Sequence, residues 1–194
     1  KKRGNWDCWD SDRDALNYNG TEPVVAHPPC RLWGNLSHLA CRDAEITEEQ
    51  KTKEKNLAVH SLKVIRKNGG ILEHPSKSKL FQKFKIPDLT TEQLDLFGAA
   101  DDWGGFSIEI DQYDFGHVAH KMTKLYICGL KIDQLPELPQ KDESIHLCEK
   151  GLRRSICGNV KNTVRCTQKQ REYTPSGLID WFEKTLNIMT SMAE

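Results

Sequence analysis

The chain has 194 residues, of which 37% are hydrophobic and 29% are charged, and its 28 basic residues balance its 28 acidic ones. This length and composition are typical of a single globular domain with a hydrophobic core of its own. Zero net charge excludes a global attraction to nucleic acid, so any such contact needs a local basic patch. No apolar run approaches the roughly 18 residues that would span a bilayer, so we expect no membrane partner.

The seven cysteines are an odd number and include no CxxC pair. In a chain of this size they indicate reduced thiols and not a disulfide framework. The amino end has no apolar segment of the kind found in secretion signals. We therefore expect a cytoplasmic location.

The first half of the chain predicts a strand, a helix and a second strand. Residues 24–27 form a short apolar strand, which Pro28 and Pro29 end. A capping box at residues 47–50 opens a helix that Gly69-Gly70 stops. The segment 71–73 follows at once, which is the order of a βαβ unit with parallel strands. Two shorter elements are expected, an edge strand at residues 6–10 and a helix around residues 32–39.

The second half predicts two antiparallel strands and a closing helix. Residues 106–111 and 123–128 alternate between apolar and polar side chains and suggest an antiparallel pair at the sheet edge. A small helix is expected over residues 91–97, and a longer one begins after Thr174-Pro175. The fold class is therefore α/β, a single domain with a mixed sheet. Its core is residues 1–140, and residues 141–194 form a basic segment and a carboxyl-terminal helix that packs on that core.

Reactive side chains follow the predicted strands. Cys30 comes after the strand 24–27, and Glu73 ends the strand 71–73. Carboxyl ends of parallel strands meet at one edge of a sheet, where ligands bind. A thiolate that adds to C6 of a pyrimidine makes C5 nucleophilic, and a carboxyl group at N3 stabilises the charge on the ring. His27, His74 and Arg31 are the candidates for lowering the pKa of the thiol; the alternative is a structural turn with a half-buried cysteine.

The segments VVAHPPCRLWG, GGILEHP and YDFGHVAHKMTKLYICGL resemble, in order and spacing, phage-encoded relatives of the DNA cytosine-5 methyltransferases. The resemblance covers Pro23 to Leu138. It implies a methyltransferase-like, Rossmann-like sheet shortened at its amino end, in the cytoplasm of a bacterial host. It also implies that Cys30 is the covalent nucleophile and that Glu73 binds the target base. His117 and Lys121 match its third motif, and we assign them to nucleic-acid contact.

The chain departs from that family in three ways. His74 stands where the family usually has asparagine, and the large target-recognition domain is absent. The strand and glycine-rich loop that hold S-adenosylmethionine are not visible before Pro23. The group donor therefore stays open: S-adenosylmethionine is possible, and so is a protein partner that supplies the missing part. Asp7 and Asp10 are candidates for a rebuilt cofactor site, with a solvated acidic turn as the alternative.

A basic tract covers residues 149–172, with seven Lys and Arg residues against two acids. Such a tract is usually a solvated surface, and beside a base-modifying site the alternative is phosphate contact, through Arg153, Arg154, Lys161 and Arg165. Two groups of potential metal ligands also occur, but turn geometry and spacing favour no metal at either. One group is His117, His120, Asp111 and Asp114, and the other is His146, Cys148, Cys157 and Cys166.

Two functions follow from these patterns. The first is an enzyme that modifies a pyrimidine of DNA at C5, with Cys30 as nucleophile. The alternative is a non-catalytic phage protein that binds DNA or another protein on a methyltransferase scaffold. Cys30 and Glu73 together favour the enzyme, whereas the missing donor loop favours the binding protein.

Overall fold

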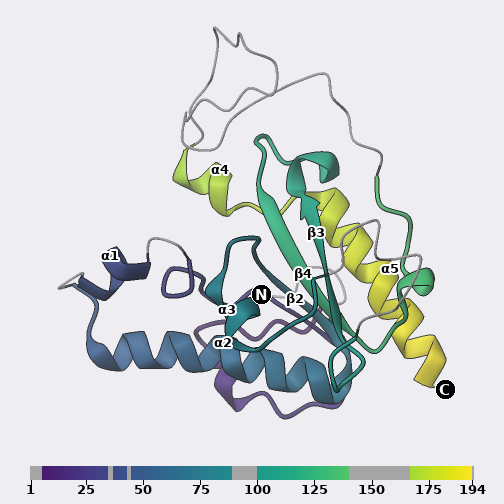
Figure 1. The fold of residues 1–194 in the computed structure, drawn as a ribbon, viewed down its shortest axis with the longest axis horizontal. Coiled ribbons are helices and arrows are strands. Elements are labelled where there is room, and N and C mark those ends of the chain that lie inside the picture. The colour runs from purple at the N-terminus through teal and green to yellow at the C-terminus, as the bar shows by residue number, and fades with distance from the viewer. Residues whose placement is uncertain (1–5, 35–36, 43–44, 89–99, 140–166, 194) are drawn as a thin grey trace, which may run out of the picture.

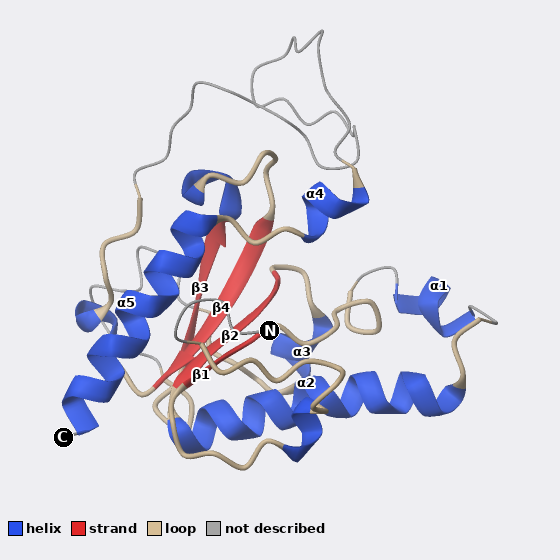
Figure 2. Cartoon of the chain, turned by 180° about the vertical axis from the view of Figure 1, so that it is seen from behind, coloured by secondary structure: helices blue, strands red, loops and turns tan. Residues whose placement is uncertain are grey.

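The computed structural model describes residues 6–34, 37–42, 45–88, 100–139 and 167–193. In this part of the chain a four-stranded sheet with the order β1-β2-β4-β3 has helices on both faces (Figures 1 and 2). Strand β1 (Val24–Ala26) pairs in parallel with β2 (Gly70–Pro75). Strand β4 (Met122–Cys128) pairs antiparallel with both β2 and β3 (Phe106–Asp111). The mixed α/β sheet and both strand pairs expected from the sequence are confirmed.

Helix α2 (Glu48–Asn68) covers one face of the sheet. It begins with the expected capping box, in which the Thr47 side chain accepts from the Gln50 amide and Gln50 reaches back. It ends at Gly69, whose φ of 83° suits glycine. The apolar residues of α2 pack against the sheet in one cluster that includes Ala58, Leu62, Ile65, Leu72 and Tyr126.

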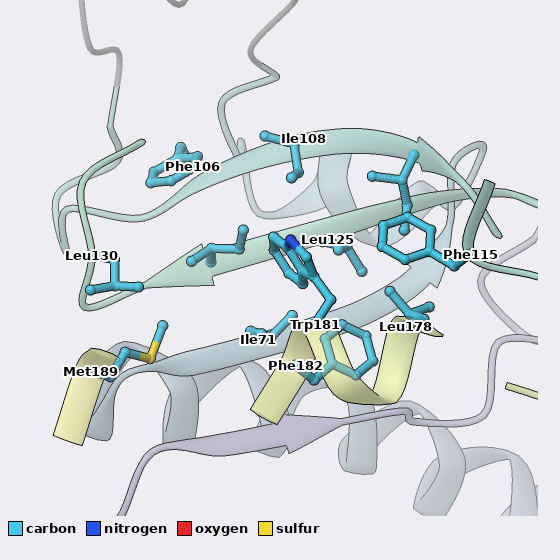
Figure 3. Packing of buried hydrophobic residues seen from close by; sticks show 12 residues of the cluster. Ile71, Phe106, Ile108, Phe115, Leu125, Leu130, Leu178, Trp181, Phe182 and Met189 are labelled. Carbon is cyan, nitrogen blue, oxygen red and sulfur yellow. The ribbon is translucent and has the colours of Figure 1, made fainter. Parts of the chain in front are cut away.

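Helix α5 (Ser176–Ala193) covers the other face (Figure 3). Its apolar side chains reach the strands and form the second core cluster with them. The principal members are Leu178, Trp181, Phe182 and Met189 from the helix and Ile71, Ile108, Leu125 and Ile127 from the sheet. Full burial of one such side chain contributes about 1.5–3 kcal/mol, so α5 is an integral part of the domain core.

The remaining elements are short. They are η1 (Ala15–Asn17), α1 (Ser37–Arg42), α3 (Lys79–Lys83), η2 (Gln112–Phe115), η3 (Ile132–Gln134) and α4 (Gln168–Glu172). Among the described residues, no helix combines the length and apolar character needed to cross a membrane.

Two of the shorter expected elements differ from the structure. Residues 6–10 form no strand: the Asp10 side chain accepts from the Asp12 amide, a local bond of the kind that competes with a strand ladder. The helix expected around residues 32–39 begins only at Ser37, because the Cys30 carbonyl accepts from the amides of Trp33 and Gly34 and closes a turn there. The helix expected over residues 91–97 lies outside the described residues.

Candidate functional site

Three of the reactive segments meet at one end of the sheet. The parallel strands β1 and β2 both end there, and the antiparallel connection from β3 to β4 lies at the same end. Hydrogen bonds join the segments: His27 donates to Glu73 at 2.8 Å, Gln112 donates to Glu73 at 3.2 Å, and the Ser76 amide donates to the Met122 carbonyl at 3.1 Å. The convergence follows from β4 lying next to β2, a neighbour relation that the sequence does not predict.

Glu73 is the buried carboxylate of this end of the sheet, with a side chain only 13% exposed. Its Oε2 accepts a hydrogen bond from His27 Nδ1 at 2.8 Å, and its Oε1 accepts from Gln112 Nε2 at 3.2 Å. Burial by itself raises the pKa of Glu73. The hydrogen bond and charge of His27, together with the charge of Lys121, outweigh burial and bring the net pKa below the ordinary value. Glu73 is therefore ionised at neutral pH.

Cys30 lies three residues after His27, in an exposed position with a reduced thiol. Its backbone is fixed: its carbonyl accepts from the Trp33 amide at 2.9 Å and from the Gly34 amide at 3.0 Å. The turn is tied in addition to the start of α3, because the Lys79 amide donates to the Trp33 carbonyl at 2.8 Å. The strand end therefore presents an accessible thiol on an ordered turn, as a nucleophile requires.

All three basic residues expected beside the thiol have other partners, and that of His27 is Glu73. Arg31 forms an ion pair with Glu54 of α2. The His74 side chain is fully buried against Phe81, and burial lowers its pKa to about 4, although the Glu73 charge and the Pro29 carbonyl act in the opposite direction. His74 is therefore neutral at neutral pH and adds no positive charge beside the thiol, contrary to the expectation. It packs inside the domain beneath the turn that carries Cys30.

The two residues assigned to nucleic acid near Glu73 differ in exposure. His117 is 2% exposed, its Nε2 donates to the Gln170 carbonyl at 2.9 Å, and its Nδ1 lies 2.7 Å from the Ala119 carbonyl. These bonds tie α4 to the loop before β4, and they do not leave His117 facing solvent as a phosphate contact would. Lys121 is half-buried, and its charge acts on the Glu73 carboxylate. Arg153, Arg154, Lys161 and Arg165 lie outside the described residues.

Two candidate metal ligands at the β3–β4 connection, Asp111 and His120, pair with each other, and His117 is bonded elsewhere. His120 Nδ1 lies 2.5 Å from Asp111 Oδ2, and its ring stacks on Tyr113 with 4.6 Å between the ring centroids. In the part of the chain that the structure describes, no three candidate ligands gather in one place. The second group, His146, Cys148, Cys157 and Cys166, falls outside that part.

The two acidic residues proposed for a cofactor site stabilise their own turn. Asp7 pairs with Arg13 and accepts from Trp9 Nε1 at 3.2 Å. Asp10 accepts from the Asp12 amide at 3.0 Å, which lowers the pKa of its carboxyl group. These bonds correspond to the solvated acidic turn that was the alternative interpretation.

Sequence reasoning missed Gln112 and Thr123. Gln112 directly follows β3 and is fully buried next to Glu73, and it also donates to Thr123 Oγ1 at 3.1 Å. The one available signal was an amide placed immediately after a strand that ends at the reactive edge. In comparisons with known proteins, no family model, curated protein or solved structure matches the chain.

Proposed function

We propose that the protein modifies a pyrimidine base of DNA at C5, with Cys30 as the covalent nucleophile. The observation that carries this proposal is the pairing of strand ends. The exposed Cys30 follows β1, the ionised Glu73 lies near the end of the adjacent parallel strand β2, and His27 of the first strand end hydrogen-bonds to Glu73 at 2.8 Å. A thiolate and an anchored carboxylate at one edge are the two groups that a pyrimidine addition requires.

The chemistry is a reversible addition. The base leaves the DNA stack, and the Cys30 thiolate forms a bond to C6 while the C5–C6 π electrons move onto C5 and the ring carbonyl. With a proton taken from solvent, Glu73 donates to N3 as the thiolate adds, which neutralises the charge on the ring, and this proton leaves N3 again when the thiolate departs. C5 then takes either a proton from water or an electrophilic carbon from a one-carbon donor, whose leaving group departs with its bonding electrons. Loss of the original C5 proton and departure of the thiolate restore the aromatic ring.

The resemblance implies S-adenosylmethionine as the donor, but the described residues ahead of β1 do not fit it. Residues 6–23 contain a single 3-10 turn and no strand, and Asp7 and Asp10 are bonded within their own segment. No step of the proposal therefore depends on that cofactor. The donor is defined only by its chemistry, as an electrophilic one-carbon compound.

A second function is a DNA- or protein-binding protein on the same scaffold without turnover. The surroundings of the thiol favour it, because His74 is neutral there and the charge of Arg31 is paired with Glu54. Under this alternative Cys30 would remain a thiol when the protein is bound to DNA.

The experiment is exchange of the C5 hydrogen, which needs no donor. Mixed-sequence duplex DNA labelled with tritium at cytosine C5 is incubated with the protein, and tritium released into water is counted. We expect release by the wild type, none by Cys30→Ser, and strongly reduced release by Glu73→Gln. Absence of release by the wild type, together with DNA binding that weakens as salt rises, would favour the binding protein instead.

A further inference from the structure

The amide of Gln112 has an orientation that its hydrogen bonds determine. Its Nε2 lies 3.2 Å from Glu73 Oε1 and 3.1 Å from Thr123 Oγ1. The Thr123 hydroxyl gives its own proton to the Lys121 carbonyl at 3.0 Å, and an ionised carboxylate can only accept. Both neighbours of Gln112 therefore need a donor, and its NH₂ group has two protons to give. The nitrogen must point toward Glu73, and the oxygen away from it.

The two carboxylate oxygens of Glu73 consequently differ in their partners. Oε1 is held by Gln112, whose side chain is fully buried and does not titrate. Oε2 is held by His27, whose side chain is 38% exposed. A base that enters from solvent can displace a partner at the surface more readily than one inside the core.

We infer that Gln112 is a positioning residue that fixes Glu73 through Oε1, so that Oε2 is the oxygen that meets the pyrimidine once His27 moves aside. This inference rests on the proposed function. Oε1 of Glu73 then holds the side chain in place, and Oε2 contacts the base. His27 is the partner that the base displaces from Oε2.

Replacement of Gln112 by glutamate keeps the size and shape of the side chain but makes its ability to donate a hydrogen bond to Glu73 depend on pH. At low pH the new carboxyl group keeps a proton and can donate it to Oε1, as the amide does. At higher pH two negative charges face each other at about 3 Å, which disfavours ionisation of the pair. The other titratable or charged groups that face Glu73 are His27 at the end of β1, Lys121 before β4 and His74 on β2, and they are the same in both proteins.

The first measurement is the rate of C5-hydrogen exchange between pH 5 and pH 8. We expect Gln112→Leu to be roughly 10- to 100-fold slower than the wild type at every pH, because Glu73 loses its fixed orientation. The rate of Gln112→Glu, divided by the wild-type rate, should fall as pH rises. Ser107→Ala is the matched control, because Ser107 is also a buried polar residue but lies within β3 and faces the other side of the sheet. Its hydroxyl donates to the Pro87 carbonyl, and in the variant that carbonyl still accepts from the amide of residue 107. The exchange rate of this control should stay within about threefold of the wild-type rate, because substitutions at distant sites without shared partners act independently.

The second measurement does not depend on activity. The ¹³C signal of the Glu73 carboxyl carbon reports its titration directly, and Gln112→Leu should raise the Glu73 pKa relative to the wild type, because a donor to the charged form is lost. If the wild type exchanges no hydrogen, the proposed function fails, and this titration still decides the role of Gln112. An unchanged Glu73 titration, or loss of protection of the Gln112 amide protons on adding DNA, would overturn the inference.

Discussion

At the scale of single residues, the site contains two histidines in opposite situations. His27 is 38% exposed and hydrogen-bonded to the Glu73 carboxylate. His74 of β2 is fully buried, and neither of its ring nitrogens makes a regular hydrogen bond. An unsatisfied buried polar group costs about 1–3 kcal/mol. Protonation of the buried His74 ring would add a larger cost.

The buried His74 makes folding stability depend on pH. Burial lowers its pKa from 6.5 to about 4, so between these values the unfolded chain binds a proton that the folded chain does not. The free energy of unfolding therefore falls as pH is lowered from 6.5 to 4, by about 3 kcal/mol for this group. Glu73 has a lowered pKa, so its contribution is lost only below its ordinary value of 4.5.

Urea unfolding of the wild type and of His74→Leu across this range tests that dependence. The variant lacks the titrating ring, so its stability relative to the wild type should increase as pH falls toward 4. His38→Leu, which changes an exposed histidine of α1, should follow the wild type. If the free energy of unfolding changes with pH by the same amount in the wild type and in His74→Leu, His74 does not titrate as described.

At the scale of elements, the site depends on β1, a strand of only three residues. Its register is Val24 to Gly70, Val25 to Ile71 and Ala26 to Leu72. Gly70 is essential to this pairing, since its φ is +131° and a Cβ there would lie 2.1 Å from the Val24 carbonyl oxygen. The close approach of the two backbones places His27 and Cys30 beside the end of β2.

Gly70→Ala should therefore disrupt β1 and the site together. We expect a loss of about 3 kcal/mol or more in the free energy of unfolding, because strain at a positive φ adds to the steric overlap. The amides of Val25 and Ala26 should exchange with deuterium much faster than in the wild type. Gly34→Ala is the control, because its Cβ would have only an ordinary contact, 3.7 Å from the Cys30 carbonyl; equal stability of the two variants would contradict this account of β1.

At the scale of the whole molecule, local signals were sufficient for the βαβ unit and for the antiparallel pair. The capping box at Thr47 and the stop at Gly69 are local features, so the boundaries of α2 followed from the sequence within one or two residues. The position of β4 between β2 and β3 depends on long-range pairing, which no local pattern contains. Tyr126 illustrates the consequence: the alternating pattern of its strand predicts a solvent-facing side chain, but the side chain is fully buried beneath α2.

The same distinction applies to the site. Cys30 and Glu73 were predictable because each follows a recognisable strand. The roles of Gln112 and Thr123 were not, because they depend on β4 bringing its loop next to Glu73. The pairing of Arg31 with Glu54 likewise depends on the packing of α2 beside the Cys30 turn.

The central claim, that the Cys30 thiolate adds to C6 of a pyrimidine in DNA, has one most direct test. A pool of duplexes that contain 5-azacytosine in randomised flanks is mixed with the protein, without any donor, and the denatured protein is weighed by intact-mass spectrometry. Nitrogen at position 5 makes C6 more electrophilic, so the equilibrium favours the adduct and its reversal, by loss of the thiolate from C6, should be slow enough for the measurement. The account predicts a mass increase equal to one oligonucleotide for the wild type and for Cys8→Ser, and none for Cys30→Ser. A wild type that gains no mass, or an adduct that survives in Cys30→Ser, would contradict it.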